Sequence, residues 1–323
     1  MSENIDAIVL MGPTATGKTS LAIRLAQALD GEIVSADSAL VYRGMDIGTA
    51  KPDVSEMAGI PHHLVSVRDP GDPYSAADFK ADADRLIPEI RKRGRMPILT
   101  GGTMLYFKAF EEGLSCLPET TPEIRKKVNE LIEEEGLPRV RDWLREFDPE
   151  SWERLAANDV QRIGRACEVY LMTGKSLTEL IRSQPRKGCP WQLRRFALLP
   201  DPERRLLRPI IRERFAKMLE KGFEAEVRAL FERGDLTPDL PALRSVGYRQ
   251  MWQYLAGEIS YDEMKERAVI ATCQLAKRQM TWIRGWKQPY ISLEMGAADN
   301  PETVLRELKA QIFATQGGEI RKE

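Results

Sequence analysis

Histidine and cysteine are scarce in this 323-residue sequence, which contains two of the first and four of the second. The cysteines are scattered without a Cys-x-x-Cys pair, a spacing that argues against a zinc ribbon and against a disulfide framework. They are Cys116, Cys167, Cys189 and Cys273. The two histidines, His62 and His63, precede a predicted strand without a partner nucleophile or metal-ligand spacing, so we expect both to be structural.

A long apolar run is also missing, since no stretch approaches the roughly 20 residues that span a bilayer. Ala7–Met11 is too short for the core of a signal peptide, and the acidic residues Glu3 and Asp6 precede it. We therefore expect a cytoplasmic protein without a membrane segment, and a monomer is the default expectation for its assembly.

Neither sign of charge dominates, because 48 Lys and Arg stand against 49 Asp and Glu, for a net charge of −1. The overall balance therefore does not indicate a nucleic-acid partner. Residues 195–290, however, carry 18 basic and 13 acidic side chains, so an anionic ligand would meet its most favourable field there. Solvated helix faces are the alternative explanation of this distribution.

Strand-like and helix-like segments alternate through the first 114 residues. Short apolar runs indicate buried strands, whereas Leu21, Leu25 and Leu29 recur with helical spacing. The predicted elements are strand Ala7–Met11, helix Lys18–Leu29, strand Glu32–Ala36, strand His63–Val67, helix Ser75–Arg93 and strand Pro97–Thr100. Such alternation predicts an α/β fold with a parallel, doubly wound sheet.

The pattern changes after about residue 114. Residues 115–194 are helical and charge-rich with no clear strand, and Arg195–Leu199 then resembles a return to the sheet. Beyond it we expect a helix that starts at Asp201 and Pro202, helices Ser245–Leu255 and Ser260–Trp286, and a strand Tyr290–Leu293. The sequence thus predicts a core of 1–114 and 195–315, an inserted all-helical domain at 115–194, and a tail at 316–323.

The segment between the first strand and the first helix fits the P-loop pattern G-x-x-x-x-G-K-[ST] in full. Glycines allow backbone N–H groups to turn toward phosphate oxygens, and the helix N-terminus adds the positive end of its dipole. Lys18 supplies a point charge, and the Thr19 hydroxyl is a candidate ligand for Mg²⁺. The predicted diphosphate-binding residues are Gly12, Pro13, Thr14, Ala15, Thr16, Gly17, Lys18 and Thr19.

An acid stands at the end of only one of the strands predicted near this loop. Enzymes that transfer a γ-phosphoryl group often carry an Asp there, but Gly-Gly-Thr follows the strand Pro97–Thr100. Asp37 follows the second predicted strand. Since ligands bind at the carboxyl ends of parallel strands, Asp37 and Thr103 should both face the bound diphosphate. The Asp37 carboxylate could bind magnesium, accept a proton from an attacking group, or cap a turn.

Six segments, in order along nearly the whole chain, resemble the bacterial tRNA dimethylallyltransferases, also called tRNA isopentenyltransferases. They are GPTATGKT (12–19), SADSALVYRGMDIGTAKP (35–52), LTGGTMLYFKAF (99–110), DVQRIGRACEVY (159–170), RSVGYRQM (244–251) and LAKRQMTWIRGW (275–286). The resemblance implies that a dimethylallyl group passes from dimethylallyl diphosphate to N6 of the tRNA adenosine on the 3′ side of the anticodon. It also implies that Mg²⁺ assists the departing diphosphate and that the helical insertion binds the anticodon stem-loop.

The resemblance assigns roles to individual residues. It implies catalysis by Asp37, Thr103 and Lys18, with Asp37 beside the adenine amine. The implied tRNA contacts are Asp37, Ser38, Ala39, Leu40, Thr103, Arg125, Gln161, Arg162, Ile163, Gly164, Arg165, Arg244, Lys277 and Arg278. Many relatives carry a glutamine in place of Leu40, so a polar contact to the base is either absent here or made by the backbone.

Two further assignments concern the C-terminal half. The resemblance implies that an arginine near the predicted helix after residue 201 reaches the diphosphate, with Arg212 as the first candidate and Arg214 as the alternative. Trp282 and Trp286 are four residues apart on a predicted helix, a spacing that favours packing over base stacking.

Three other functions fit part of the sequence. A small-molecule P-loop kinase accounts for residues 12–19 but not for the helical insertion. A prenyltransferase acting on free adenylate has less need of a segment that binds a stem-loop. An RNA-binding protein with a nucleotide-dependent switch leaves the position of Asp37 unexplained.

Overall fold

The computed structural model describes residues 5–115, 117–184, 187–201 and 207–317, with side chains as far as Lys309. The chain divides into two compact units. Met1–Glu111 and Cys189–Glu323 form one, which we call the sheet unit, and Glu112–Gly188 form the other, the helical unit. Within the described residues, no helix combines the length and the apolar character that a membrane span requires.

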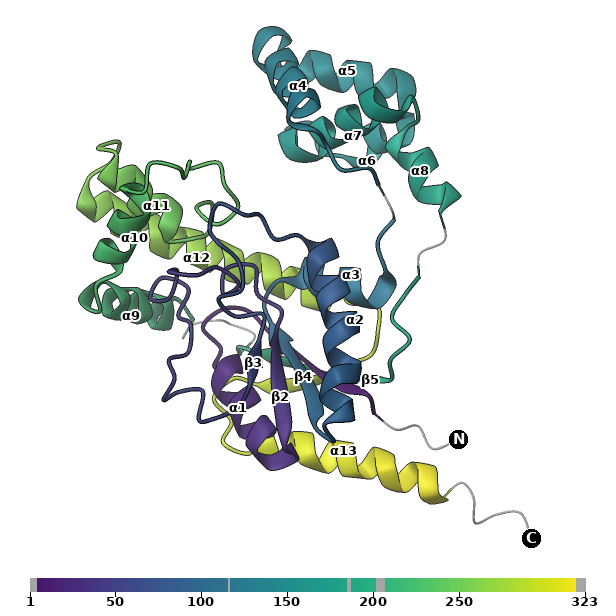
Figure 1. Ribbon diagram of the computed structural model, residues 1–323, viewed down its shortest axis with the longest axis vertical. Coiled ribbons are helices and arrows are strands. Elements are labelled where there is room, and N and C mark those ends of the chain that lie inside the picture. Colours follow the sequence, from purple (N-terminus) through teal and green to yellow (C-terminus); the bar gives the residue numbers. More distant parts are fainter. Residues whose placement is uncertain (1–4, 116, 185–186, 202–206, 318–323) are drawn as a thin grey trace. The chain divides into compact units, whose positions relative to one another are not determined.

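The sheet unit is built on six parallel strands in the order β3-β2-β4-β1-β5-β6 (Figure 1). They are β1 (Ala7–Met11), β2 (Gly31–Ser35), β3 (His62–His63), β4 (Met96–Gly101), β5 (Leu193–Leu199) and β6 (Ile291–Glu294). The order departs from the chain order on both sides of β1, as in a doubly wound sheet. The predicted fold class is therefore confirmed.

Side chains alternate between the two faces of this sheet, as the period of a strand requires. Ile8 and Leu10 join one hydrophobic cluster, whereas Val9 and Met11 join the other. The first cluster includes residues of α1 (Lys18–Leu29) and α13 (Asn300–Gly317). The second includes residues of α2 (Ala76–Lys92), α3 (Met104–Glu112), α9 (Leu207–Glu220), α10 (Phe223–Phe231), α11 (Tyr248–Leu255) and α12 (Tyr261–Arg284).

Local signals in the sequence fix several helix ends. The Ser75 hydroxyl accepts from the backbone N–H groups of Ala77 and Asp78, and the Asp78 carboxylate accepts from Ser75 N, so the predicted capping box is present. Ser260 caps α12 in a similar way through Glu263 N. Both helices therefore begin where their polar side chains replace the missing intrahelical partners.

The structure differs from the prediction at one strand and contains helices that were not predicted. The strand predicted at His63–Val67 is only His62–His63, because Leu64 (φ 61°) and Ser66 (φ 54°) adopt left-handed conformations that end it. The predicted helix start at Asp201 and Pro202 borders 202–206, which lie outside the described residues, and α9 is described from Leu207. The helices α3, α10 and α13 were not separately predicted.

The helical unit contains α4 (Pro122–Glu135), α5 (Leu137–Phe147), α6 (Pro149–Arg154), α7 (Val160–Thr173) and α8 (Leu177–Ser183). Its core joins Val128, Val140, Leu144 and Cys167 among others. Asp148 caps α6 through Ser151 N and also accepts from Thr178 Oγ1 at 2.7 Å. Since the unit ends at Gly188 and β5 begins at Leu193, residues 189–194 of the predicted insertion belong to the sheet unit.

Candidate functional site

The P-loop connects β1 to α1 and is shaped by its own backbone. Ala15 (φ 66°) and Gly17 (φ 87°) both adopt left-handed conformations, and Thr16 Oγ1 donates to Pro13 O at 2.9 Å. A Cβ at Gly12 would lie 2.6 Å from Leu198 O, so only glycine allows the loop to approach β5. Gly17 is the N-cap of α1 and has no side chain to cap the first turn, whose N–H groups thus remain for an anion.

Lys18 supplies the cation of this loop. Its Nζ donates to Pro13 O at 2.5 Å. Burial lowers the pKa of the Lys18 ammonium to about 8, an effect that Asp37 opposes and Arg214 reinforces. A desolvated cation of this kind gains most from an anionic ligand that replaces the lost water.

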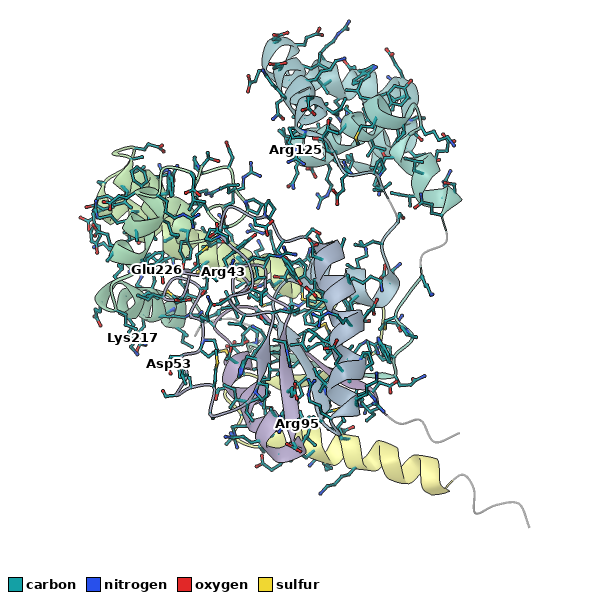
Figure 2. All side chains as sticks on the ribbon, in the orientation of Figure 1. Arg43, Asp53, Arg95, Arg125, Lys217 and Glu226 are labelled. Carbon is teal, nitrogen blue, oxygen red and sulfur yellow. The ribbon has the colours of Figure 1, made fainter. Side chains whose placement is uncertain are left out.

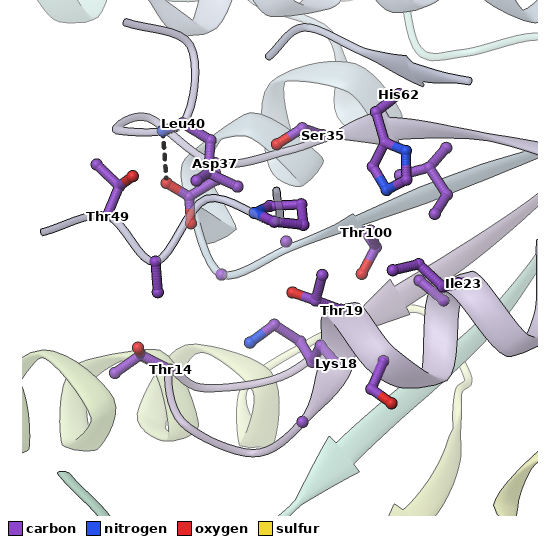
Figure 3. A pocket seen from close by; sticks show the side chains of 18 of the residues that line it. Thr14, Lys18, Thr19, Ile23, Ser35, Asp37, Leu40, Thr49, His62 and Thr100 are labelled. Atoms are coloured by element: carbon purple, nitrogen blue, oxygen red, sulfur yellow. Dashed lines mark hydrogen bonds between the residues drawn. The ribbon is translucent and has the colours of Figure 1, made fainter. Parts of the chain in front are cut away.

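Asp37 follows β2 and faces the loop (Figure 3). Its Oδ1 accepts from Ala39 N at 2.9 Å and from Leu40 N at 3.4 Å, while no described residue donates to Oδ2. Thr103 supports the same segment, because its Oγ1 accepts from Ser38 N at 2.9 Å and its N–H donates to Ala36 O. One carboxylate oxygen therefore holds a turn while the other remains for a ligand.

Two cavities of about 490 and 500 Å³ adjoin at these residues. The first lies over the P-loop and the start of α1, and includes Leu40 (Figure 3). The second extends past Ser38, Ala39 and Thr103 to residues of α9 and α12. Residues that line both are Thr14, Ala15, Asp37, Thr49, Gly102, Arg214 and Gln279. Gly12, Pro13 and Thr16 line neither cavity and instead shape the loop from behind.

The first cavity contains polar atoms without protein partners. Ser35 Oγ, Thr100 Oγ1 and His62 Nε2 are buried and have no hydrogen-bond partner among the described residues. Ser35 pairs with Thr100 across β2 and β4, and His62 pairs with Ile33, so all three side chains share the sheet face that packs on α1. Figure 3 labels all three side chains, with Thr100 nearest to Thr19. Hydroxyl groups left in this state are suited to water molecules or to a polar ligand.

Gln279 of α12 joins the P-loop to the turn after β4. Its Oε1 accepts from Thr14 N and its Nε2 donates to Gly102 O, both at 2.9 Å. The side chain is 8% exposed and lines both cavities. Sequence reasoning missed it, although it lies between Arg278 and Met280 in a segment already singled out.

A second carboxylate holds the chain that follows Asp37. Glu226, labelled in Figure 2, accepts from Asp46 N at 2.8 Å, Ile47 N at 2.7 Å, Gly48 N at 3.0 Å and Tyr248 OH at 2.5 Å. These bonds anchor the segment that leads directly into Thr49, which lines both cavities. Burial, followed by the charge of Glu226, raises the pKa of Tyr248 well above its usual range, so this phenol remains a donor.

Arg212, the first candidate for the diphosphate, lies outside both cavities. Arg212 is exposed and its Nη2 lies 3.3 Å from Glu266, away from both cavities. Arg214, the alternative, lines both cavities. Its charge contributes to the lowered pKa of Lys18. Burial lowers the pKa of Arg214 itself, and the Asp37 carboxylate opposes that shift. Residues two positions apart on an α-helix are separated by about 200° around its axis, so the two arginines point in nearly opposite directions.

The predicted tRNA contacts fall into several places. Arg244 and Arg278 line the second cavity, whereas Lys277 is exposed outside it. In the helical unit, Arg125 (labelled in Figure 2), Gln161 and Arg162 are exposed. These positions remain predictions.

Three other residues of the predicted run 161–165 have structural roles. Ile163 is 0% exposed in the core of the helical unit, and Gly164 is buried beside Val128, so neither offers a side chain to RNA. The Arg165 guanidinium donates to Pro118 O, Thr120 Oγ1 and Glu168 Oε2, which ties the chain before α4 to α7. The helical period explains this division, because one face of α7 must pack inward.

Known proteins resemble this chain along most of its length. A family model for IPP transferases matches residues 40–286. The tRNA isopentenylpyrophosphate transferase of Bacillus halodurans is 31% identical, and the match covers 98% of this chain and 99% of that one at a TM-score of 0.71. The tRNA delta(2)-isopentenylpyrophosphate transferase of Staphylococcus epidermidis is 32% identical, and the match covers 95% of this chain and 98% of that one at a TM-score of 0.66. A eukaryotic dimethylallyltransferase acting on tRNA is 26% identical, covering 96% and 79%, at a TM-score of 0.78.

Proposed function

Because this chain belongs to the IPP transferase family and is a tRNA prenyltransferase, we propose that dimethylallyl diphosphate is its donor and N6 of the adenosine on the 3′ side of the anticodon its acceptor. The observation that carries this proposal is the position of Asp37, on the wall that the P-loop cavity shares with the second cavity. A donor held at the P-loop and a purine entering from the second cavity would meet at this carboxylate.

The reaction needs a better nucleophile and a stabilised leaving group. The lone pair of an adenine amine is delocalised into the ring, so a carboxylate that accepts its proton assists attack. As the N6–C1 bond forms, the C1–O bond to the diphosphate breaks, and Asp37 Oδ2 accepts the amine proton. Lys18, Arg214 and the N–H groups at the start of α1 would stabilise the charge that accumulates on the departing diphosphate.

Magnesium fits this site as a companion of the diphosphate. No three His, Cys, Asp or Glu side chains of the described residues gather into a metal site, and Mg²⁺ commonly keeps its waters and binds through substrate phosphates. The Thr19 hydroxyl would be its protein ligand, with the unpartnered hydroxyls of Ser35 and Thr100 facing its water shell. The ion would supply positive charge that neutralises the leaving diphosphate.

We further propose that residues in each unit contact the anticodon stem-loop. Arg244 and Arg278 at the second cavity, and Arg125, Gln161 and Arg162 on the helical unit, are the candidate contacts. A base in a single-stranded loop costs least to flip, which suits a target beside the anticodon. A cytoplasmic monomer is the corresponding proposal for location and assembly.

Labelled dimethylallyl diphosphate, Mg²⁺ and unmodified tRNA provide the direct test. We expect label in RNA, and in one prenylated adenosine after digestion to nucleosides. Transfer of label to free adenylate, or ATP consumption without labelled RNA, would contradict the proposal. A tRNA lacking an adenosine at the target position is the matched control, and it should remain unlabelled.

A further inference from the structure

Trp282, near the end of α12, is exposed in the second cavity. Its side chain is 38% exposed although a buried position was expected, and it lines the cavity together with Leu105 of α3, which is 50% exposed. Trp286, four residues later, packs against the core instead. Two large apolar side chains left open inside one cavity mark a surface that a ligand covers.

Positive charge surrounds this apolar surface. Arg278 precedes Trp282 by one helical turn and lines the same cavity, as does Arg244. From α3, the Lys108 ammonium lies 5.7 Å from the centroid of the indole ring. An aromatic plane flanked by cations binds single-stranded nucleic acid, because bases stack on the ring while the cations attract phosphates.

We infer that Trp282 is a stacking platform for the nucleotide next to the target adenosine in the tRNA loop. This inference rests on the proposed function, which brings the target base to Asp37 from the same cavity. Removing one base from a stacked loop leaves its neighbour without a stacking partner. The indole ring would replace that partner and thereby position the flipped adenosine.

Three variants test the platform. Trp282→Leu removes the aromatic plane but keeps apolar bulk, whereas Trp282→Phe keeps a smaller plane. Tyr261→Leu is the matched control, because Tyr261 is 37% exposed at the other end of α12, has Lys265 Nζ 4.9 Å from its ring centroid, and lines neither cavity. We expect Trp282→Leu to raise KM for tRNA about five- to 150-fold, Trp282→Phe to restore part of the loss, and Tyr261→Leu to have no effect. KM for the donor should stay within about twofold.

Changes in the RNA, tested with the wild-type protein, make the test independent of protein folding. An abasic residue on the 5′ or the 3′ side of the target adenosine should weaken binding of a stem-loop RNA to the wild type. The same abasic residue should weaken RNA binding by Trp282→Leu only slightly further, because the stacking partner is already absent from that protein. Equal losses in both proteins at both positions, or an unchanged KM for tRNA in Trp282→Leu, would overturn the platform while wild-type transfer to tRNA remained. Absence of wild-type transfer would overturn the proposed function as well.

Discussion

The two cavities meet at Asp37 but differ in chemistry. The first offers helix N–H groups, Lys18 and unpartnered hydroxyls, which suit a compact anion. The second offers Trp282, Leu105 and side chains of α9, together with Arg244 and Arg278, which suit a flat ring attached to a charged backbone. Under the proposed function, each substrate would have its own compartment, and only residues of the shared wall would act on both.

The largest effect should follow from changing the shared wall itself. Asp37→Asn keeps an oxygen that can accept from Ala39 N but removes the proton acceptor. We expect the single-turnover rate to fall about 10²- to 10⁴-fold, with the dissociation constants of donor and tRNA little changed. A rate within tenfold of the wild type would remove Asp37 from the role of base.

Two arginines of α9 allow the effect of a cavity cation to be compared with that of a surface cation. Arg214→Ala removes a cation from both cavities, and we expect KM for the donor to rise about 10- to 150-fold, the equivalent of a hydrogen bond to a charged group. Arg212→Ala is the control, since Arg212 pairs with Glu266 outside both cavities, and it should change KM less than twofold. Equal effects of the two substitutions would contradict the assignment.

Donor binding should depend on pH through Lys18. The ammonium of the free protein has its pKa near 8 because of burial, so it is charged at pH 7 and largely neutral at pH 9. An anionic donor favours the charged form, and we therefore expect its affinity to fall about tenfold from pH 7 to pH 9. The measurement is equilibrium binding of a donor analogue, and tRNA affinity provides the comparison for the other cavity. Lys18→Met should give a flat profile for the donor, whereas a flat profile in the wild type would refute the prediction.

The smallest effect should come from the helical unit. Arg162 is 69% exposed in its side chain and is one of the predicted tRNA contacts. Arg162→Ala should weaken tRNA binding a few-fold and reduce the slope of log affinity against log salt by about one. Arg182→Ala is the control, because Arg182 has the same 69% side-chain exposure and, like Arg162, an acidic partner, but is not among the predicted tRNA contacts. An unaltered salt slope in Arg162→Ala would exclude Arg162 from the interface.

The parts of this molecule that follow from local chemistry could be predicted from the sequence. The P-loop, the strand at Ala7–Met11 and the helix at Lys18–Leu29 have the predicted bounds, because turn glycines, short apolar runs and helical spacing each act over a few residues. The position of Asp37 also followed, since the carboxyl ends of parallel strands share one edge.

Features that depend on the phase of a helix or on distant contacts could not be predicted. The choice between Arg212 and Arg214 requires the rotation of α9, which its charge-rich sequence leaves ambiguous. The exposure of Trp282 depends on the cavity that α3 and α12 line together. The hydrogen bonds of Gln279 to the P-loop and to Gly102, and those of Glu226 to Asp46, Ile47 and Gly48, join segments more than 170 residues apart. No spacing pattern in the sequence reports such pairs.

The bonds of Gln279 restrict which amino acids can occupy two positions. A carboxamide offers an acceptor to Thr14 N and a donor to Gly102 O in a single plane, whereas Glu lacks the donor and Asn is one methylene shorter. A Cβ at Gly102 would lie 2.4 Å from Gln279 Nε2, so any larger residue there would displace the amide. In a library randomised at both positions, selection for activity should therefore recover glutamine and glycine together rather than either one alone.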